Sequence, residues 1–231
     1  MKSADPNVSI VELVAEALGE LRSELVLVGG CSVGLLITDR ARPAVRQTID
    51  VDLVAEVVSL GDYYEGLSPR LRACGFVENG DHMCRWTRGR LIIDVMPSTN
   101  VLGHSVNRWY GITVASANRH SLPSGREILV VSAPLFLATK LEAFHGRGNG
   151  DYLGSTDMED IVNVIDGRPE LIDEVRICPS EVREFLEDEF DRLLADASFA
   201  DQLPGHLPGD EASQGRVPLI IKRIRRLAGI L

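Results

Sequence analysis

The run from Thr48 to Leu53, Thr-Ile-Asp-Val-Asp-Leu, limits the fold more than any other stretch of the sequence. Its two acids, Asp50 and Asp52, are separated by one residue, so an extended strand would place both carboxylates on the same face. Neighbouring carboxylates repel each other, and a divalent cation with a phosphorylated ligand is the usual compensation. A strand at an exposed edge, with solvated Asp side chains, is the alternative. The apolar residues of the run would point into a core: Ile49, Val51 and Leu53.

Length and composition restrict the class of protein. The 231 residues suffice for one large domain or two small ones. No apolar run approaches the roughly 20 residues of a membrane helix, and the first residues lack a basic region followed by an apolar one. We therefore expect a cytoplasmic protein that does not associate with membranes. The four cysteines lack metal-ligand spacing, which argues against a zinc site and against a disulfide framework.

Charge is distributed unevenly along the chain. A net charge of −10 disfavours non-specific coating of nucleic acid, because phosphate repulsion would oppose it. The C-terminal segment is nevertheless basic and contains no acid after residue 216. Its basic residues are Arg216, Lys222, Arg223, Arg225 and Arg226. This asymmetry is compatible with a polyanionic partner, and a helix with a solvated basic face explains it equally well.

Apolar periodicity and turn residues predict alternating strands and helices first, then helices alone. The apolar run 25–28 stops at Gly29-Gly30 and a helical segment follows, which predicts strand, glycine turn and helix. Further strands are predicted at 50–58, 76–78, 83–87, 91–96 and 127–131. Helices are predicted at 8–21, 62–74, 107–117, from 133, at 157–165, 169–175, 179–194 and from 217, with a polar linker at 203–214. We therefore expect a mixed α/β domain, 1–131, and a C-terminal helical domain, 132–231.

Two further features carry potential chemistry. Asp94 interrupts the apolar run 91–96, where a lone carboxylate is costly to bury without a partner. Gly29-Gly30 and the nearby Ser32 lie where a strand gives way to a helix. Backbone N–H groups, the helix dipole and the serine hydroxyl could bind a phosphate there. The segment matches neither the dinucleotide fingerprint nor the Walker pattern, so taken alone a plain turn is the default interpretation.

The combination of these features resembles the nucleotidyltransferase superfamily. A Gly-Gly turn opens a helix, Asp-x-Asp follows on the next strand, and a third Asp lies on a later strand. The matching residues are Gly29, Gly30, Asp50, Asp52 and Asp94. The resemblance implies an antiparallel-leaning mixed β-sheet with flanking helices, a turn that holds a triphosphate, and three carboxylates that bind one or two Mg²⁺ ions. The spacing from Gly30 to Asp50 exceeds that of the shortest members, and the loop 40–47 would absorb the excess.

A narrower resemblance covers most of the chain. The run 46–52, Arg-x-Thr-x-Asp-x-Asp, and the runs 133–143 and 155–161 look like AbiEii-type nucleotidyltransferases, toxins of bacterial type IV toxin–antitoxin and phage-defence systems. The helical half of that family contributes a Lys and an Asp-x-x-Asp helix, which correspond to Lys140, Asp157 and Asp160. Many members carry a basic residue before the first of these acids. Thr156 stands there in this chain, so nearby Arg147 is the candidate for that role.

These resemblances imply Mg²⁺-dependent transfer of a nucleoside monophosphate from a nucleoside triphosphate to an acceptor hydroxyl. Asp50 and Asp52 would hold metal, and Asp94 would complete a second metal position and accept the acceptor's proton. The phosphates would contact Gly29, Gly30, Ser32 and Lys140, with Lys140 or Arg147 oriented by Asp157 and Asp160. Simpler interpretations are a helix lysine with its amine in solvent, and for Asp157 an acid that complements the helix dipole.

The acceptor is open at this stage. The toxin resemblance implies tRNA or another RNA 3′ end, and a cognate antitoxin protein as a partner. A protein hydroxyl fits the sequence equally well, and an aminoglycoside-like small molecule is a third enzyme interpretation. A nucleotide-binding partner protein without catalysis is the alternative from another class. The presence of all three carboxylates favours an enzyme.

Overall fold

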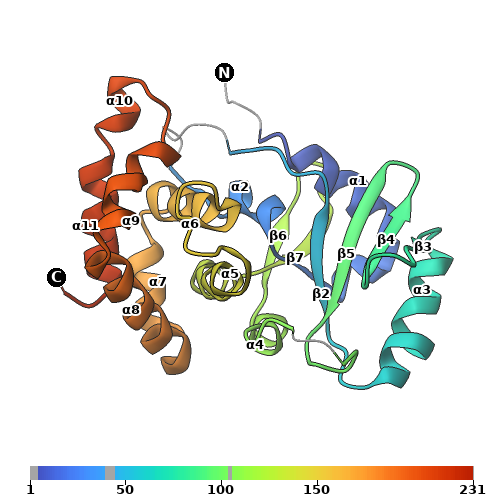
Figure 1. Cartoon of the computed structure of the whole chain (residues 1–231). Coiled ribbons are helices and arrows are strands. Elements are labelled where there is room, and N and C mark those ends of the chain that lie inside the picture. Colours follow the sequence, from blue (N-terminus) through green and yellow to red (C-terminus); the bar gives the residue numbers. More distant parts are fainter. Residues whose placement is uncertain (1–4, 40–44, 104–105, 231) are drawn as a thin grey trace. The chain divides into compact units, whose positions relative to one another are not determined.

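The computed structural model describes residues 5–39, 45–103 and 106–230, and these divide into two compact units. The sheet unit comprises residues 5–34 and 45–132, and the helical unit comprises residues 35–39 and 133–230 (Figure 1). Residues 40–44 of the predicted loop lie outside the described residues. The division into two domains, 1–131 and 132–231, stays a prediction.

Within the described ranges, the sheet unit contains a seven-stranded sheet in the order β3-β4-β5-β2-β1-β7-β6. The strands are β1 (Leu25–Leu27), β2 (Val51–Ala55), β3 (Val77–Glu78), β4 (Arg85–Arg88), β5 (Leu91–Pro97), β6 (Asn118–Ser121) and β7 (Glu127–Val130). The pairs β1–β7 and β2–β5 are parallel, and the other neighbouring pairs are antiparallel. The predicted antiparallel-leaning mixed sheet is therefore confirmed.

Strand β2 alternates between core and surface only along part of the predicted run. Val51 and Leu53 are buried, whereas Asp52 between them is partly exposed, as the period of two requires. The prediction that Ile49 faces the core is wrong, because its side chain is 77% exposed. The strand begins only at Val51 and residues 49 and 50 form a bend, so the alternation does not extend back to Ile49.

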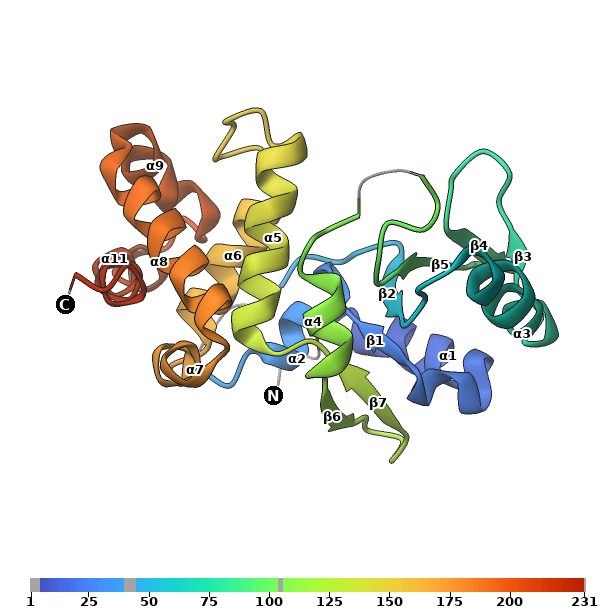
Figure 2. The same ribbon diagram turned by 90° about the horizontal axis from the view of Figure 1, so that it is seen from below.

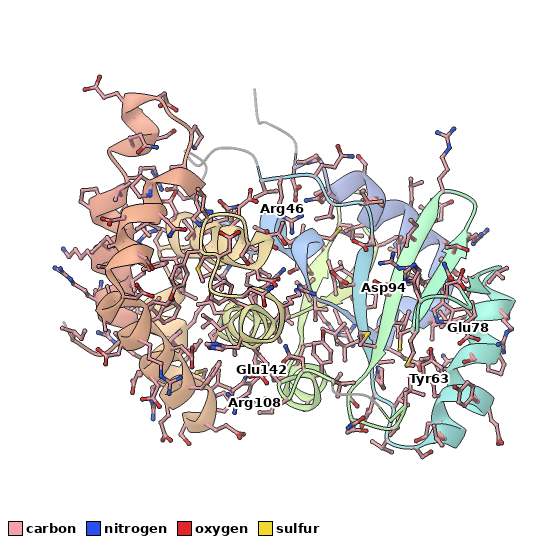
Figure 3. The ribbon with its side chains drawn as sticks, viewed as in Figure 1. Arg46, Tyr63, Glu78, Asp94, Arg108 and Glu142 are labelled. Atoms are coloured by element: carbon pink, nitrogen blue, oxygen red, sulfur yellow. The ribbon has the colours of Figure 1, made fainter. Side chains whose placement is uncertain are left out.

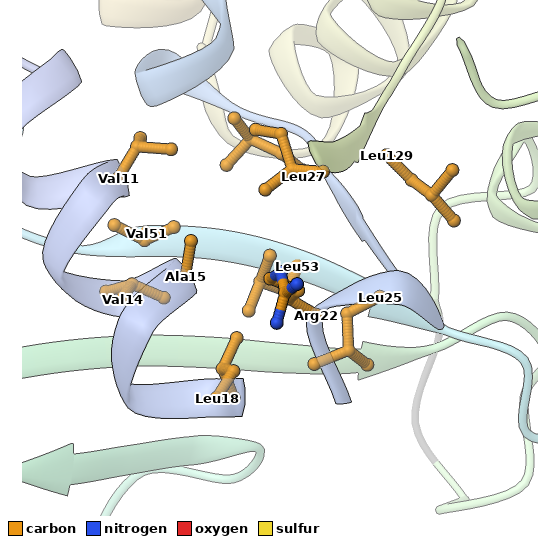
Figure 4. A pocket seen from close by; sticks show the side chains of 11 residues that line it. Val11, Val14, Ala15, Leu18, Arg22, Leu25, Leu27, Val51, Leu53 and Leu129 are labelled. Carbon is orange, nitrogen blue, oxygen red and sulfur yellow. The ribbon is translucent and has the colours of Figure 1, made fainter. Parts of the chain in front are cut away.

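Helices flank this sheet. They are α1 (Val8–Leu18), the short turns η1 (Gly19–Ser23) and η2 (Gly30–Ser32), α2 (Val33–Leu36), the π-helical η3 (Asp62–Leu67), α3 (Ser68–Ala73) and α4 (Tyr110–Ala115). The buried face of α1 has the spacing expected for an amphipathic helix, with Val11, Val14, Ala15 and Leu18. Figure 4 shows this face against the sheet, where it leaves a cavity of about 20 Å³. A space that small holds at most a water molecule, so this side of the sheet is core.

The helical unit confirms the predicted C-terminal helical region. Its helices are α5 (Ala133–Arg147), α6 (Thr156–Gly167), α7 (Leu171–Ile177), α8 (Ser180–Ala195), α9 (Ala197–Gln202), η4 (Leu203–His206), α10 (Glu211–Gln214) and α11 (Val217–Leu227). Helix α5 packs against α6, α7 and α8 (Figure 2) and is buried almost all round from Ala133 to Leu141. The predicted linker 203–214 is wrong in part, because Leu203 and Leu207 are buried and anchor short helical turns.

The segment 35–39 belongs to the helical unit although it precedes β2 in the chain. The backbone N–H groups of Thr38 and Asp39 donate to the carbonyl of Gly167, at 3.0 and 2.9 Å. Arg216 donates to Asp39 at 2.8 Å. These contacts fix the segment to the last residue of α6 and to the residue that precedes α11. No helix in the described ranges is long and apolar enough to cross a membrane.

Candidate active site

The glycine turn that follows β1 is shaped by its contact with Asp52. Gly29 has φ 65° and ψ −164°, a conformation essentially restricted to glycine. A Cβ atom placed on Gly29 would lie 2.0 Å from Oδ2 of Asp52. The turn therefore requires glycine for two independent reasons, and the predicted proximity of the turn to the Asp-x-Asp strand is present in the structure.

The three predicted acids lie close together in the sheet unit. Asp52 on β2 is paired in parallel register with Asp94 on β5 (Figure 3 labels Asp94), so their side chains are neighbours on one face of the sheet. Asp50 lies in the bend before β2. The next strand outward, β4, places Arg85 opposite Asp94 in antiparallel register. Arg85, Asp94 and Asp52 thus form one row across three adjacent strands.

Arg85 joins two of the three acids. Its Nη2 atom lies 2.6 Å from Oδ2 of Asp50 and 2.7 Å from Oδ2 of Asp94, and its Nε atom donates to Oδ1 of Asp94 at 2.8 Å. The hydrogen bond to Asp94 is the main reason that the pKa of Arg85 lies above its ordinary value. The side chains of Asp94, Arg85 and Asp50 are 20%, 27% and 36% exposed, so a ligand in solvent can reach the group.

Arg85 is a residue that the sequence analysis missed. The signal was present in the hairpin of β4 and β5, since the turn Gly89-Arg90 sets the register that places Arg85 opposite Asp94. A charged residue on the solvent side of an edge-proximal strand is common, however. The pattern alone therefore did not mark Arg85 as part of a site.

The rest of the turn is held by local hydrogen bonds. Ser32 is fully buried, and its hydroxyl donates to the carbonyl of Gly29 at 2.8 Å. Its predicted contact with phosphate stays a prediction. The Sγ atom of Cys31 lies 2.7 Å from Oγ1 of Thr48. Burial raises the pKa of the Cys31 thiol to about 12, and the negative charge of Asp52 adds to this. Cys31 is therefore a neutral structural thiol.

The donors in this group suit a hard divalent cation. Within the residues that the structure describes, no three His, Cys, Asp or Glu side chains are grouped around a common metal position, and a guanidinium joins Asp50 to Asp94 instead. Carboxylate oxygens are the ligands that Mg²⁺ prefers. Asp50 and Asp94 share one guanidinium, and Asp52 lies beside Asp94 in register. Residue type and access from solvent therefore fit the predicted magnesium ion.

The other predicted residues form a second cluster, inside the helical unit. The Nζ atom of Lys140 on α5 lies 3.0 Å from Oδ1 of Asp157 and 2.7 Å from Oδ2 of Asp160, both on α6. Arg147 makes a two-point contact with Asp157, through Nε at 2.7 Å and Nη2 at 2.8 Å. The residues that the resemblance groups together therefore lie in contact, and the roles it implies for them stay predictions.

Burial distinguishes the members of this second cluster. The side chains of Lys140, Asp157 and Asp160 are 8%, 2% and 1% exposed, so Lys140 does not extend its amine into solvent. Burial opposes the charge of Lys140, but the carboxylates of Asp160 and Asp157 outweigh it and raise the pKa of Lys140. Burial likewise opposes the charge of Asp157, but Arg147 and Lys140 lower its pKa. Lys140 and Asp157 are therefore held charged by their partners in a compact buried network.

Arg147 is the accessible cation of this cluster. Its side chain is 67% exposed, and it borders a hollow of about 340 Å³ beside the N-terminus of α6. The hollow is lined by Arg147, Gly148, Asn149, Asp151, Gly154, Ser155, Thr156 and Asp157. Ser155 caps α6 by accepting a hydrogen bond from the backbone N–H of Met158. The structure thus presents Arg147, and not Lys140, to solvent.

The basic C-terminal segment is only partly a surface feature. Arg216 contacts the buried Asp166 at 2.8 Å, and Arg223 donates to the backbone carbonyl of Ile165 at 2.8 Å. Both arginines therefore stabilise the interior of the helical unit. The three basic residues of α11 that are exposed are Lys222, Arg225 and Arg226.

Comparisons with known proteins bear on the fold. No protein-family model and no curated protein sequence matches the chain. Among solved structures, the chain is similar to the crystal structure of an antigenic nucleotidyltransferase-like protein from Paracoccidioides brasiliensis. The TM-score is 0.53 at 20% sequence identity, over 88% of this chain and 94% of that chain. The chain therefore has a nucleotidyltransferase-like fold, a mixed sheet followed by a helical region.

Proposed function

We propose that this protein is a nucleotidyltransferase that moves a nucleoside monophosphate from a nucleoside triphosphate to an acceptor hydroxyl. One observation carries the proposal: Asp52 and Asp94 are cross-strand neighbours on β2 and β5, and Asp52 lies against the Gly29 turn. Asp50, in the bend before β2, is joined to Asp94 through Arg85. Packing of a hydrophobic core does not explain three acids at this position. A solvated strand edge does not explain the close contact between Asp52 and Gly29. The nucleotidyltransferase-like fold supports the same reading.

The three acids and the glycine turn would have different roles. Asp50, Asp52 and Asp94 would hold Mg²⁺, which neutralises the triphosphate and makes its α-phosphorus more electrophilic. Gly29 and Gly30 carry no side chain of their own, which would allow the main chain to approach a phosphate closely. Ser32 keeps the turn in shape through its bond to Gly29.

The chemical step is a displacement at phosphorus. The acceptor oxygen forms a bond to the α-phosphorus while the bond from that phosphorus to the bridging oxygen breaks, and pyrophosphate leaves with the electron pair. Asp94 accepts the proton of the acceptor hydroxyl, a role open to a carboxylate that is 20% exposed. Asp52 lies against the turn and would hold the metal ion together with Asp50 and Asp94.

The helical cluster presents one exposed cation, Arg147. We assign the exposed Arg147 as its phosphate-binding group, with Asp157 fixing the guanidinium by a two-point contact. Lys140 and Asp160 hold Asp157 from the buried side. Direct contact of Lys140 with a leaving group is the alternative that the family resemblance implies.

The acceptor that we favour is an RNA 3′ end, with tRNA as the first candidate. The exposed basic residues Lys222, Arg225 and Arg226 on α11 give this acidic protein a local surface for a phosphate backbone. The role of a bacterial toxin, with a cognate antitoxin as partner, belongs to the same proposal. The acidic balance of the chain favours one second candidate, a cationic aminoglycoside-like acceptor.

Labelled substrates test this proposal. The full-length protein is incubated with Mg²⁺ and each α-labelled nucleoside triphosphate, alone, with total RNA, or with an aminoglycoside. We expect label in RNA. Asp94→Asn should reduce the rate by about 10²–10⁴-fold, because it removes a proton acceptor, whereas Asp188→Asn, an exposed control on α8, should not. Absence of label from RNA, protein and small molecule alike would leave a non-catalytic nucleotide-binding protein as the better description.

A further inference from the structure

Arg85 has no role in the reaction proposed above, yet its guanidinium contacts two of the three acids. It contacts Asp94 at two points, through Nε at 2.8 Å and Nη2 at 2.7 Å. The same Nη2 atom reaches Asp50 at 2.6 Å. One cation therefore uses oxygen atoms from two of the three carboxylates that would ligate a metal.

The geometry points to Arg85 as an internal counter-cation of the metal site, a positioning residue that a divalent cation displaces when it binds. The inference rests on the proposed function, since it takes Asp50 and Asp94 as metal ligands. In the metal-free protein, Arg85 holds these two carboxylates together against their mutual repulsion. In the metal-bound protein, it releases at least one of them.

Two physical arguments support this displacement. A carboxylate oxygen that accepts a short hydrogen bond from a guanidinium cannot direct the same lone pair at a metal ion. A guanidinium and a dication at neighbouring positions also repel each other, and this repulsion grows as water is excluded from the site. Metal binding must therefore work against the contacts of Arg85, and the affinity of the site includes the cost of breaking them.

The contacts of Arg85 also predict which one breaks first. Asp94 is held by a two-point contact, the stronger arrangement for arginine and carboxylate, whereas Asp50 is held by a single nitrogen. Asp94 is moreover the direct cross-strand neighbour of Arg85. We infer that Asp50 is released to the metal first and that Arg85 stays beside Asp94.

The test is a Mn²⁺ titration of the full-length protein at low ionic strength, followed by the electron paramagnetic resonance signal of free Mn²⁺. Arg85→Gln removes the competing charge and should bind Mn²⁺ about tenfold more tightly than wild type. Arg85→Lys keeps the charge without the planar fork and should fall between the two. Arg90→Gln, an exposed control in the turn that joins β4 to β5, should match wild type. Tighter binding is a readout that loss of a merely structural salt bridge would not give.

The outcomes separate this inference from the function on which it rests. Equal or weaker Mn²⁺ binding by Arg85→Gln, together with lost binding by Asp94→Asn, overturns the role of Arg85 alone. Unchanged binding by Asp94→Asn overturns the three acids as the metal site, and with them both proposals. Circular dichroism of each variant checks that the fold is retained, and Arg85→Lys supplies the comparison if Arg85→Gln does not fold.

Discussion

Gly29→Ala tests the contact on which the site is built. The backbone at Gly29 has φ 65° and ψ −164°, and holding a residue with a Cβ there costs about 1–3 kcal/mol. The new methyl group would also lie 2.0 Å from Oδ2, 2.7 Å from Cγ and 2.8 Å from Cβ of Asp52, so Asp52 must move. Overpacking of this kind costs about 1–3 kcal/mol more. We therefore expect Gly29→Ala to lower the free energy of unfolding by about 2–6 kcal/mol.

A matched control isolates the clash. Gly19 has a similar φ of 57°, but a Cβ there meets nothing within 4 Å, so Gly19→Ala should show the backbone cost alone, about 1–3 kcal/mol. Urea unfolding followed by circular dichroism measures both variants. A Mn²⁺ titration of the folded proteins should show at least a tenfold loss of affinity for Gly29→Ala and none for Gly19→Ala.

Equal stability and equal Mn²⁺ affinity of the two alanine variants would refute the proposed role of Gly29. That result would mean that Asp52 does not depend on the glycine for its position. A stability loss without any loss of metal affinity would separate the turn from the metal site. In that case, Gly29 would be a structural glycine only.

Two further predictions concern the helical cluster. Asp157→Asn leaves the buried Lys140 with one carboxylate fewer and should lower the free energy of unfolding by about 3–5 kcal/mol, whereas Asp188→Asn should change it by less than about 0.5 kcal/mol in the same urea titration. Stability of the wild type should be flat between roughly pH 5 and pH 9. The pKa of Asp157 is lowered. Its contribution to the free energy of unfolding is therefore complete above about pH 4, the ordinary pKa of an aspartate, and is lost as the pH falls through the lowered pKa. The pKa of Lys140 is raised. Its contribution to the free energy of unfolding is therefore complete below about pH 10, the ordinary pKa of a lysine, and is lost as the pH rises through the raised pKa. An acid limb as steep in Asp157→Asn as in wild type would contradict this assignment.

Much of the fold follows from local sequence patterns. The alternation of buried and exposed residues predicts β2 and β5, and apolar periodicity predicts α5, α6 and α8, because these elements bury one face or more. Strand β6 has no counterpart among the predicted strands. Its residues, Asn-Arg-His-Ser, are mostly exposed at the edge of the sheet, so they carry no apolar signal.

The relative position of two candidate residues is predictable from the sequence when both lie on one helix. Asp157 and Asp160 are three residues apart on one helix, so they share a face and both reach Lys140. What local patterns could not supply depends on how elements pair. The position of Arg85 requires the β4–β5 register, and the exposure of Ile49 requires knowing that β2 starts two residues later.

The buried charges of the helical unit likewise could not be predicted from local sequence patterns. The basic residues from Arg216 onward appear in the sequence as one surface. Arg216 instead contacts the buried Asp166 on α6 and Asp39 of the segment 35–39. Such contacts join residues far apart in the chain, and only tertiary packing reveals which charges are paired inside and which remain exposed.

The central claim is that these residues transfer a nucleoside monophosphate, and one measurement tests it most directly. The wild-type protein is given the same triphosphate labelled either at the α-phosphorus or at the γ-phosphorus, with Mg²⁺ and total RNA. We expect the acceptor to gain the α label alone and the γ label to appear in pyrophosphate. Transfer of the γ label to the acceptor, or release of both labels without any product bond, would contradict it.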